Sequence, residues 1–356
     1  MAISAKQVKE LRDLTGAGMM DAKNALVETD GDMDKAIEIL REKGAASAVK
    51  KQSKVAAEGL IKLHVAEDNS KGALVEINSQ TDFVAKNEVF IDLTDKIVKH
   101  VYDNDISTVE ELNASEIDGQ NFEDFLKEQI ASIGENIVVR RLALFEAGEN
   151  DFIMGYVHFN KTNGVLLRVK VDSEETKEKA KDIAHKVAMH ISALGPEYIT
   201  YNEFPEGFVE AELSGLIGHL KVENEDNEIL GKPLKTIPEY GSRSQITDEV
   251  LKAKEEEIRQ ELLDEGKPEK ILDRIIPGKM ARFLEDNTQI DSQFALYSQG
   301  FVLDPEKTVE EALKEESAKV NGEIEVVEYK RFVVGEGIER KEEDFAAEVA
   351  QQMSGK

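Results

Sequence analysis

Residues 81–87, which read Thr-Asp-Phe-Val-Ala-Lys-Asn, are the most informative stretch for the fold of this chain. They follow the apolar run at 73–77 and precede an amphipathic segment from 88 to about 101. A strand is therefore predicted to end here and a helix to begin, with Phe83 at the junction. Two interpretations of Phe83 are open. Either Asp82 caps the helix and Phe83 turns inward as core, or the rigid frame holds Phe83 outward against a partner.

The strand pattern around this stretch occurs twice, which indicates an internal repeat. The matching segments are 59–65 and 155–159, 72–77 and 164–169, and the helices at about 86–101 and 176–193. Two copies of strand-turn-strand-helix predict an α+β core of two related halves. The second copy has Lys-Val-Asp-Ser-Glu at 170–174, without an aromatic residue. A feature that occurs in one half only is easier to explain as function than as framework.

The N-terminal residues predict a separate unit of three short helices. Ser4 and Gln7 have the spacing of a capping box, and further helices are expected at about 19–28 and 33–42. Residues 1–54 hold ten Lys and Arg against nine Asp and Glu, although the whole chain carries a net charge of −28. The stretch 43–54 has four lysines and no acid, so it is expected to be a basic connector. Two interpretations of this uneven charge are open. Either the acidic remainder is a solvated surface that keeps the protein soluble, or a partner contacts residues 1–54 and the acidic remainder with different surfaces.

The second half of the chain predicts an insertion into the core. Prolines and glycines make 205–246 look irregular, and helical patterns follow on either side of the turn at 266–268. They predict an antiparallel helical hairpin whose second helix Pro277 kinks or breaks. Thr308 and Glu311 have capping-box spacing. A strand is expected at 323–334, and a last helix at about 342–351 with Phe345 and Val349 one turn apart.

These patterns divide the chain into five parts. The expected domains are 1–54, three helices and connector; 55–147, the first half of the core; 148–204 with 287–322, the second half; 205–286, an irregular insertion and helical hairpin; and 323–356, a C-terminal strand-helix module.

Composition excludes several classes of protein. The chain has 356 residues, with 33% charged and 40% hydrophobic, an ordinary balance for a globular protein. It has no cysteine, so disulfides and cysteine-ligated zinc are excluded. The net charge argues against direct binding of nucleic acid. No segment is apolar enough to span a membrane, and the start lacks the apolar region of a secretory signal, so a cytoplasmic protein is expected.

No pattern of catalytic residues stands out. His185 and His190 are five apart and miss the one-face spacing of a paired zinc site. There is no phosphate-cradling GxxxxGK[ST] sequence and no nucleophile elbow. Two functions stay open at this point: an adaptor that binds protein surfaces through its three-helix unit, and a metal-dependent enzyme that uses surface carboxylates.

Several motifs occur in one order along the chain. They are 81–87, Thr-Gly-Ala-Gly-Met-Met-Asp-Ala-Lys at 15–23, Gly-Glu-Asn-Ile at 134–137 with Arg140 and Arg141, Glu-Gly-Lys-Pro-Glu at 265–269, and Val-Gly-Glu-Gly-Ile-Glu at 334–339. Together they resemble bacterial elongation factor Ts, the nucleotide-exchange factor of elongation factor Tu. The resemblance covers nearly the whole chain except about 205–246, a stretch that is extra relative to the family pattern. It implies a ubiquitin-associated-like fold for the first three helices.

The resemblance also implies a mechanism and its residues. Thr81, Asp82, Phe83 and Val84 match the segment that dislocates Mg²⁺ from elongation factor Tu, with Phe83 as the wedge. The matching partner-binding residues are Arg12, Met19, Met20 and His158. For the two methionines, a core role and an exposed role are both open. Around His158, the sequence 159–163 replaces the expected glycine- and arginine-bearing turn. The implied protein is not an enzyme, binds no cofactor or metal, and has elongation factor Tu as its partner; a homodimer through the helical hairpin is left open.

Overall fold

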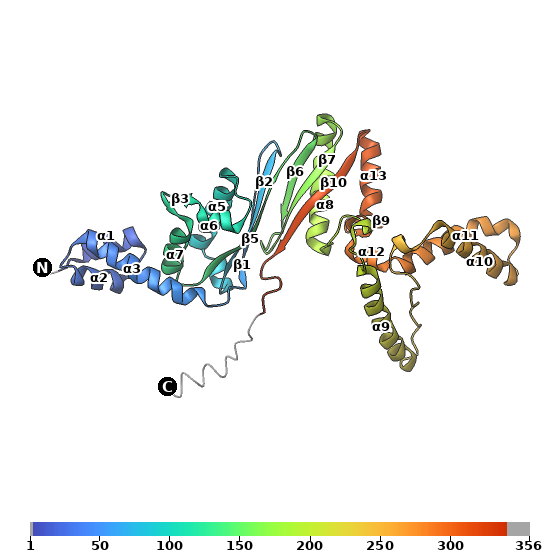
Figure 1. Ribbon diagram of the computed structural model, residues 1–356, viewed down its shortest axis with the longest axis horizontal. Helices are drawn as coiled ribbons and strands as arrows, with labels where there is room; N and C mark the ends of the chain where they lie inside the picture. Colours follow the sequence, from blue (N-terminus) through green and yellow to red (C-terminus); the bar gives the residue numbers. More distant parts are fainter. Residues whose placement is uncertain (1–2, 340–356) are drawn as a thin grey trace. The chain divides into compact units, whose positions relative to one another are not determined.

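The computed structural model describes residues 3–339, without the side chains of 45–47, 49 and 50. It mixes helices with small antiparallel sheets, so the α+β class is confirmed. Two compact units result: one holds the chain up to Arg168 and again from Tyr329, and the other holds Val169–Glu328 (Figure 1). The expected helix at 342–351, with Phe345 and Val349, lies outside the described residues. No helix within 3–339 is long and apolar enough to cross a membrane.

The first unit begins with three helices: α1 Ala5–Thr15, α2 Met19–Glu28 and α3 Met33–Gln52. The predicted capping box is present, since the Ser4 hydroxyl accepts from the Gln7 N–H and the Gln7 side chain accepts from Ser4 N–H. Gly16 ends α1 in the left-handed conformation that glycine adopts without strain. Helices α1 and α2, with 11 and 10 residues, are too short to be stable alone, so a shared apolar core holds the three helices together; it contains Val8, Leu11, Ala22, Ala25, Leu26 and Ala36.

The stretch 43–54 is not a connector outside the third helix, as the sequence had suggested. Instead, α3 continues through it to Gln52 and packs against α7, Phe122–Ile133. Ala48 is fully buried in the same apolar cluster as the sheet and α7. Alanine and lysine are good helix formers, and no proline interrupts them, so the lysine run extends the helix.

A sheet of strand order β1-β2-β5 forms the centre of the first unit. The strands are β1 Glu58–Val65, β2 Lys71–Ser79 and β5 Ile137–Glu146, and all pairs are antiparallel. After β2 come α4, Asp82–Ala85, and α5, Glu88–Asp103. Phe90 of α5 and Phe122 of α7 are fully buried against Val75 and Ile77 of β2. Between α5 and α7 lie α6, Val109–Ala114, and the hairpin β3, Glu116–Ile117, with β4, Gln120–Asn121.

A second sheet has the order β10-β7-β6. It contains β6 Asp151–Val157, β7 Asn163–Val171 and β10 Ile324–Val333. Its Ile153 and Leu166 share an apolar cluster with Ile61 and Leu74 of the first sheet. Glycine permits this close approach, because an added Cβ at Gly155 would lie 2.5 Å from Leu63 and one at Gly164 would lie 2.5 Å from Ile61.

The second unit is mostly helical. Its elements are α8 Glu174–Leu194, α9 Phe208–Ile229, α10 Asp248–Asp264, α11 Glu269–Asn287, α12 Gln289–Phe294, β8 Gly300–Phe301, β9 Asp304–Thr308 and α13 Val309–Val320. The predicted capping box of Thr308 and Glu311 begins α13. The repeat is confirmed at the level of local structure, because each strand pair leads into a long helix, α5 or α8.

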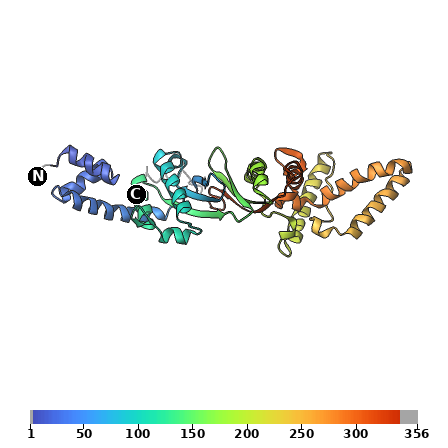
Figure 2. The same ribbon diagram turned by 90° about the horizontal axis from the view of Figure 1, so that it is seen from above.

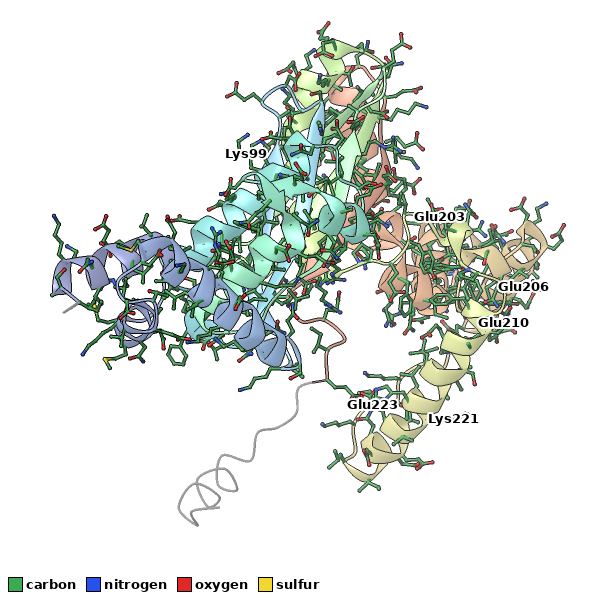
Figure 3. All side chains as sticks on the ribbon, turned by 60° about the vertical axis from the view of Figure 1, so that its left-hand side comes forward. Lys99, Glu203, Glu206, Glu210, Lys221 and Glu223 are labelled. Carbon is green, nitrogen blue, oxygen red and sulfur yellow. The ribbon has the colours of Figure 1, made fainter. Side chains whose placement is uncertain are left out.

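The prediction that 205–246 is irregular was wrong for 208–229, which form a helix, and is confirmed for 230–242, which hold no helix or strand. Helix α9 takes up 22 of these residues, and Figure 3 labels its charged Glu210, Lys221 and Glu223. The chain then returns beside α9, where Asn224 bonds both the N–H and the carbonyl of Lys235. The Phe208 ring lies 5.1 Å from Phe204 and 5.2 Å from Phe294, and these aromatic contacts secure the start of the helix.

The expected antiparallel hairpin is present as α10 and α11, which lie side by side (Figures 1 and 2). Ile258 and Leu262 of α10 are buried against Leu272 and Ile276 of α11. Of the two effects expected of Pro277, a break in the second helix was wrong, because α11 runs through Pro277 to Asn287. A proline removes one backbone hydrogen bond, and the apolar seam beside it offsets that loss.

Candidate functional site

The first candidate site is the one-turn helix α4 at the end of β2. Thr81 is its N-cap, with an extended backbone and a hydroxyl that accepts from the Val84 N–H at 3.3 Å. The Phe83 side chain is 81% exposed. The interpretation in which Phe83 is core is therefore wrong. An aromatic side chain left in water at a fixed position gains nothing for the fold, which favours the interpretation that it contacts a partner.

Apolar packing on one side of α4 turns Phe83 to the other side. Ala85 is buried in the core cluster and Val84 packs against it half-buried. The backbone then turns once more, and Asn87 caps α5 by accepting from the Val89 N–H at 2.9 Å. Two caps in succession, Thr81 and Asn87, hold the stretch between strand and long helix in one conformation.

Asp82 does not cap a helix, contrary to one of the two sequence interpretations. It occupies the first position of α4, and its carboxylate accepts from Lys86 Nζ at 2.6 Å. The hydrogen bond from Lys86 is the main reason that the pKa of Asp82 lies below its usual value. Asp82 is therefore a charged, solvated neighbour of Phe83 at neutral pH.

The N-terminal candidates lie on α1 and α2. Met19 and Met20, the first two residues of α2, are 50% and 63% exposed, so the interpretation that both fill the core is wrong. Arg12 forms an exposed ion pair with Asp13 at 2.9 Å. Leu14, which the sequence patterns did not single out, is 65% exposed; only its place one residue before the Thr15-Gly16 helix end could have drawn attention to it.

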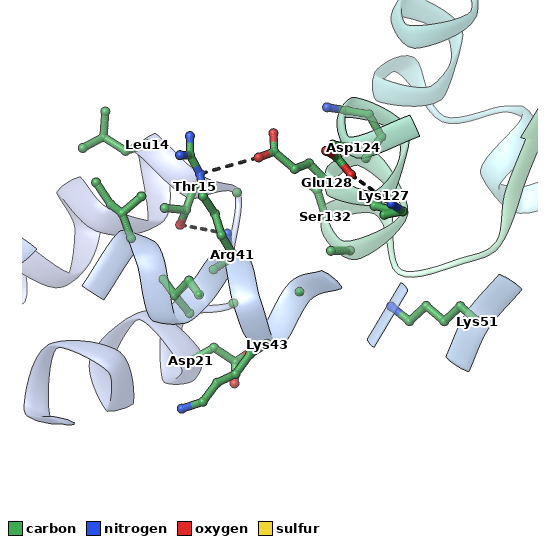
Figure 4. A pocket seen from close by; sticks show the side chains of 18 of the residues that line it. Leu14, Thr15, Asp21, Arg41, Lys43, Lys51, Asp124, Lys127, Glu128 and Ser132 are labelled. Atoms are coloured by element: carbon green, nitrogen blue, oxygen red, sulfur yellow. Dashed lines mark hydrogen bonds and ion pairs between the residues drawn. The ribbon is translucent and has the colours of Figure 1, made fainter. Parts of the chain in front are cut away.

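A cavity of about 800 Å³ lies between the helical bundle and α7 (Figure 4). It is lined by both signs of charge, with Arg41 3.5 Å from Glu128 and Lys127 2.9 Å from Asp124. The lining charges therefore largely offset one another. Among the residues that the structure describes, no group of three or more His, Asp or Glu could hold a metal ion.

His158 lies at the turn between β6 and β7. Its Nδ1 is 2.8 Å from the Tyr156 hydroxyl, and its ring centroid is 4.5 Å from that of Phe159, which is 86% exposed. The carbonyl of Lys161 in this turn accepts from the Ile61 N–H of β1 at 2.7 Å. Helix α4 also contacts β1. The helix that carries Phe83 and the turn that carries His158 therefore both contact β1. Arg12, Met19 and Met20 belong instead to the bundle that packs on α7.

The chain is closely similar to proteins of one family. The family model described as "Elongation factor TS" matches residues 80–336. Elongation factor Ts of Campylobacter fetus subsp. fetus (strain 82-40) is 50% identical over 354 residues, which cover 99% of this chain and 100% of that protein. Elongation factor Ts of Helicobacter hepaticus (strain ATCC 51449 / 3B1) is 48% identical over 351 residues, and that of Campylobacter curvus (strain 525.92) is 50% identical over 353.

These similarities correct one expectation about 205–246. The matches extend over 98–100% of both chains, so these relatives have a stretch of comparable length. The segment is therefore not an addition peculiar to this chain.

Proposed function

The chain belongs to the elongation factor Ts family, and we propose that it acts in translation elongation as the guanine-nucleotide exchange factor of elongation factor Tu, with Phe83 as the wedge that promotes GDP release. The observation that carries the wedge role is the 81% exposure of Phe83 on a helical turn whose other face is buried. Thr81, Asp82 and Val84 form the frame of this wedge.

The exchange needs no covalent step. A factor that binds the nucleotide-free partner more tightly than the GDP-bound partner weakens GDP binding by the same ratio. Each ~1.4 kcal/mol of differential binding weakens the nucleotide about tenfold. Inserting an apolar ring among the partner's segments that hold Mg²⁺ and phosphate supplies this difference, so the chain itself needs no metal or cofactor. We accordingly propose that it is not an enzyme in the ordinary sense.

The test is release of a fluorescent GDP from elongation factor Tu, followed in time with and without this protein. We expect release to accelerate with increasing concentration of the chain and to saturate. Unchanged release, with binding of the partner demonstrated separately, would overturn the proposal and favour the adaptor alternative, in which the three-helix unit alone accounts for binding.

The other contacts extend the same proposal. The three-helix unit, taken as ubiquitin-associated-like, offers Arg12, Met19 and Met20 to the partner, and the β6–β7 turn offers His158. Exposed methionines suit such a surface, because their flexible thioether chains adapt to the partner's shape. The domain division at 54, 147, 204, 286 and 322 belongs to this proposal too, although α3 runs through the first boundary region as one continuous helix up to Gln52.

The same proposal places the protein in the cytoplasm. It also holds that the protein binds no nucleic acid directly, because its net charge is −28.

A second copy of the chain is proposed as an additional partner, bound through the hairpin of α10 and α11. Leu263 and Ile271 near the hairpin turn are 40% and 39% exposed. Light-scattering mass of the full chain beside a Leu263→Lys and Ile271→Lys variant tests the dimer; a monomer mass for the unmodified chain would contradict it.

A further inference from the structure

The junction between α7 and β5 holds two separate parts of the first unit. Gly134 ends α7 in the left-handed conformation, and the next two side chains bond to segments far away in the sequence. Glu135 accepts from Thr81, 54 residues earlier. The Asn136 amide, 2% exposed, donates to the carbonyl of Lys54 at 2.7 Å, just past the end of α3. Two adjacent residues of the α7–β5 junction thus hold both the N-terminus of α4 and the chain that follows the C-terminus of α3.

The Glu135 carboxylate uses both oxygens on Thr81. Oε2 accepts from the Thr81 N–H at 3.0 Å, and Oε1 accepts from the Thr81 hydroxyl at 2.7 Å. Because the hydroxyl proton goes to Glu135, the oxygen keeps a lone pair for the Val84 N–H. The carboxylate therefore orients the group that caps α4. Hydrogen bonds to an ionised acceptor are stronger than neutral ones.

Helix α4 depends on this support more than a longer helix would. It has four residues, far fewer than an isolated helix needs in water. Phe83 is largely in water and adds little packing of its own, so the cap and the burial of Val84 and Ala85 hold the turn. If the cap loosens, Phe83 samples many directions, and a partner must then order the turn when it binds.

We propose that Glu135 is a positioning residue for nucleotide exchange: through Thr81 it holds α4 in the conformation that presents Phe83 to the partner. This rests on the proposed exchange function. The neighbouring Asn136 bonds to the chain just past the end of α3. The turn that carries Phe83 and the last helix of the three-helix bundle are therefore both held by hydrogen bonds to the α7–β5 junction.

The first test needs no partner. In the free protein, Glu135→Ala should accelerate amide hydrogen exchange at residues 84–86 about tenfold, the effect of losing hydrogen bonds to a charged acceptor. Glu135→Gln should leave it close to the unmodified rate, because the amide oxygen still accepts from the Thr81 N–H and its nitrogen donates to the hydroxyl. The matched control is Glu128→Ala, an acid on α7 that faces Arg41 instead, and it should change nothing at 84–86.

The second test measures GDP release from elongation factor Tu with the same variants. We expect Glu135→Ala to slow release roughly tenfold, Glu135→Gln to restore most of the rate, and Glu128→Ala to stay within about twofold of the unmodified chain. In a Phe83→Ala background, Glu135→Ala should have no further effect, because it acts through Phe83.

Two results would overturn the inference. One is an unchanged hydrogen-exchange rate at 84–86 in Glu135→Ala; the other is an equal loss of release with and without Phe83, which would mean that Glu135 acts through the general fold. Failure of the proposed function would give a different result, because the unmodified chain would then not accelerate GDP release from elongation factor Tu. The hydrogen-exchange rates would still decide whether Glu135 holds α4.

Discussion

The two halves of the core differ in how the second strand connects to the long helix that follows it. After β2, the first half inserts the extra turn α4 before α5, and Phe83 on that turn faces water. After β7, the second half goes directly into α8, where the Ser173 hydroxyl accepts from the Thr176 N–H at 3.2 Å. Thr176 is buried, and a Cβ on Gly322 would lie 2.1 Å from its hydroxyl. The second strand-to-helix junction is therefore buried by packing, whereas the first exposes a side chain to water.

The same contrast applies to the charged residue within each strand. Glu76 of β2 and Arg168 of β7 occupy matching places in the repeat. Glu76 is fully buried and bonds both Arg140 and Arg141, as well as the Gly335 N–H at 2.9 Å. Arg168 is 29% exposed and lies 3.7 Å from Asp151. The first half therefore stabilises the strand that leads to its exposed turn with a fully buried carboxylate that two arginines share, whereas the ion pair of Arg168 with Asp151 is longer and has no fully buried member.

The largest effect is expected from Glu76→Ala. Removing the buried carboxylate takes away the shared partner of Arg140 and Arg141, which are 28% and 29% exposed, while Arg141 keeps Glu336 at 3.1 Å. The expected cost is therefore about 3 kcal/mol, the lower end of the range for breaking a buried ion pair. Arg168→Ala, the matched change in the second half, should cost about 1 kcal/mol, as a partly solvated pair does. Urea unfolding of both variants measures the difference. Equal losses would show that the two halves do not differ in this respect.

Phe83→Ala should slow GDP release on the order of a hundredfold, the size expected for an aromatic residue at the centre of an interface. Its melting temperature should stay the same, because the side chain is in water. Stopped-flow release and thermal unfolding of one sample separate the two quantities. A lower melting temperature with unchanged release per folded molecule would refute the wedge role.

The long helices of the two halves should differ in their response to pH. His190 of α8 is fully buried; Nδ1 accepts from the Val302 N–H at 3.1 Å, and Nε2 donates to Gln299 Oε1 at 2.9 Å. This bonding pattern requires a neutral ring. Burial lowers the pKa of His190, and it also lowers the pKa of the more exposed His100 in α5.

A lowered pKa means that the unfolded chain binds the proton first. The stability that the neutral ring of His190 contributes is therefore fully present above about pH 6.5 and is lost as the pH falls toward the folded pKa, by up to about 1.4 kcal/mol per pH unit. Unfolding free energies between about pH 7.5 and 5.5 should show a shallower slope for His190→Gln than for the unmodified chain, and a smaller change for His100→Gln. An unchanged slope in His190→Gln would contradict the assignment.

The smallest effect is expected from Ser173→Ala, which removes the cap of α8 and should cost about 1 kcal/mol of stability. GDP release per folded molecule should not change, since the second junction presents no exposed aromatic. A loss of exchange comparable to that of Phe83→Ala would show that both junctions work on the partner, and the comparison between the halves would fail.

Features that depend on nearby residues could be read from the amino-acid sequence. Capping boxes at Ser4 and Thr308 and the strand-to-helix junction at Phe83 follow from spacings of a few residues, because local hydrogen bonds and side-chain periodicity decide them. The motifs shared with elongation factor Ts also lie in short stretches, which is why they identify the family without reference to the fold.

Features that depend on distant residues required the folded chain. Helix α9 has two interior glycines, Gly215 and Gly218, so local propensity disfavours it, and the aromatic contacts of Phe208 at its start are needed to secure it. Packing on α10 likewise carries α11 through Pro277. Phe83 faces outward because Ala85 is buried with half-buried Val84 packed beside it, and because Glu135, distant in the sequence, holds Thr81. A side chain's direction depends on which face of its element is buried, and only the folded chain supplies that face.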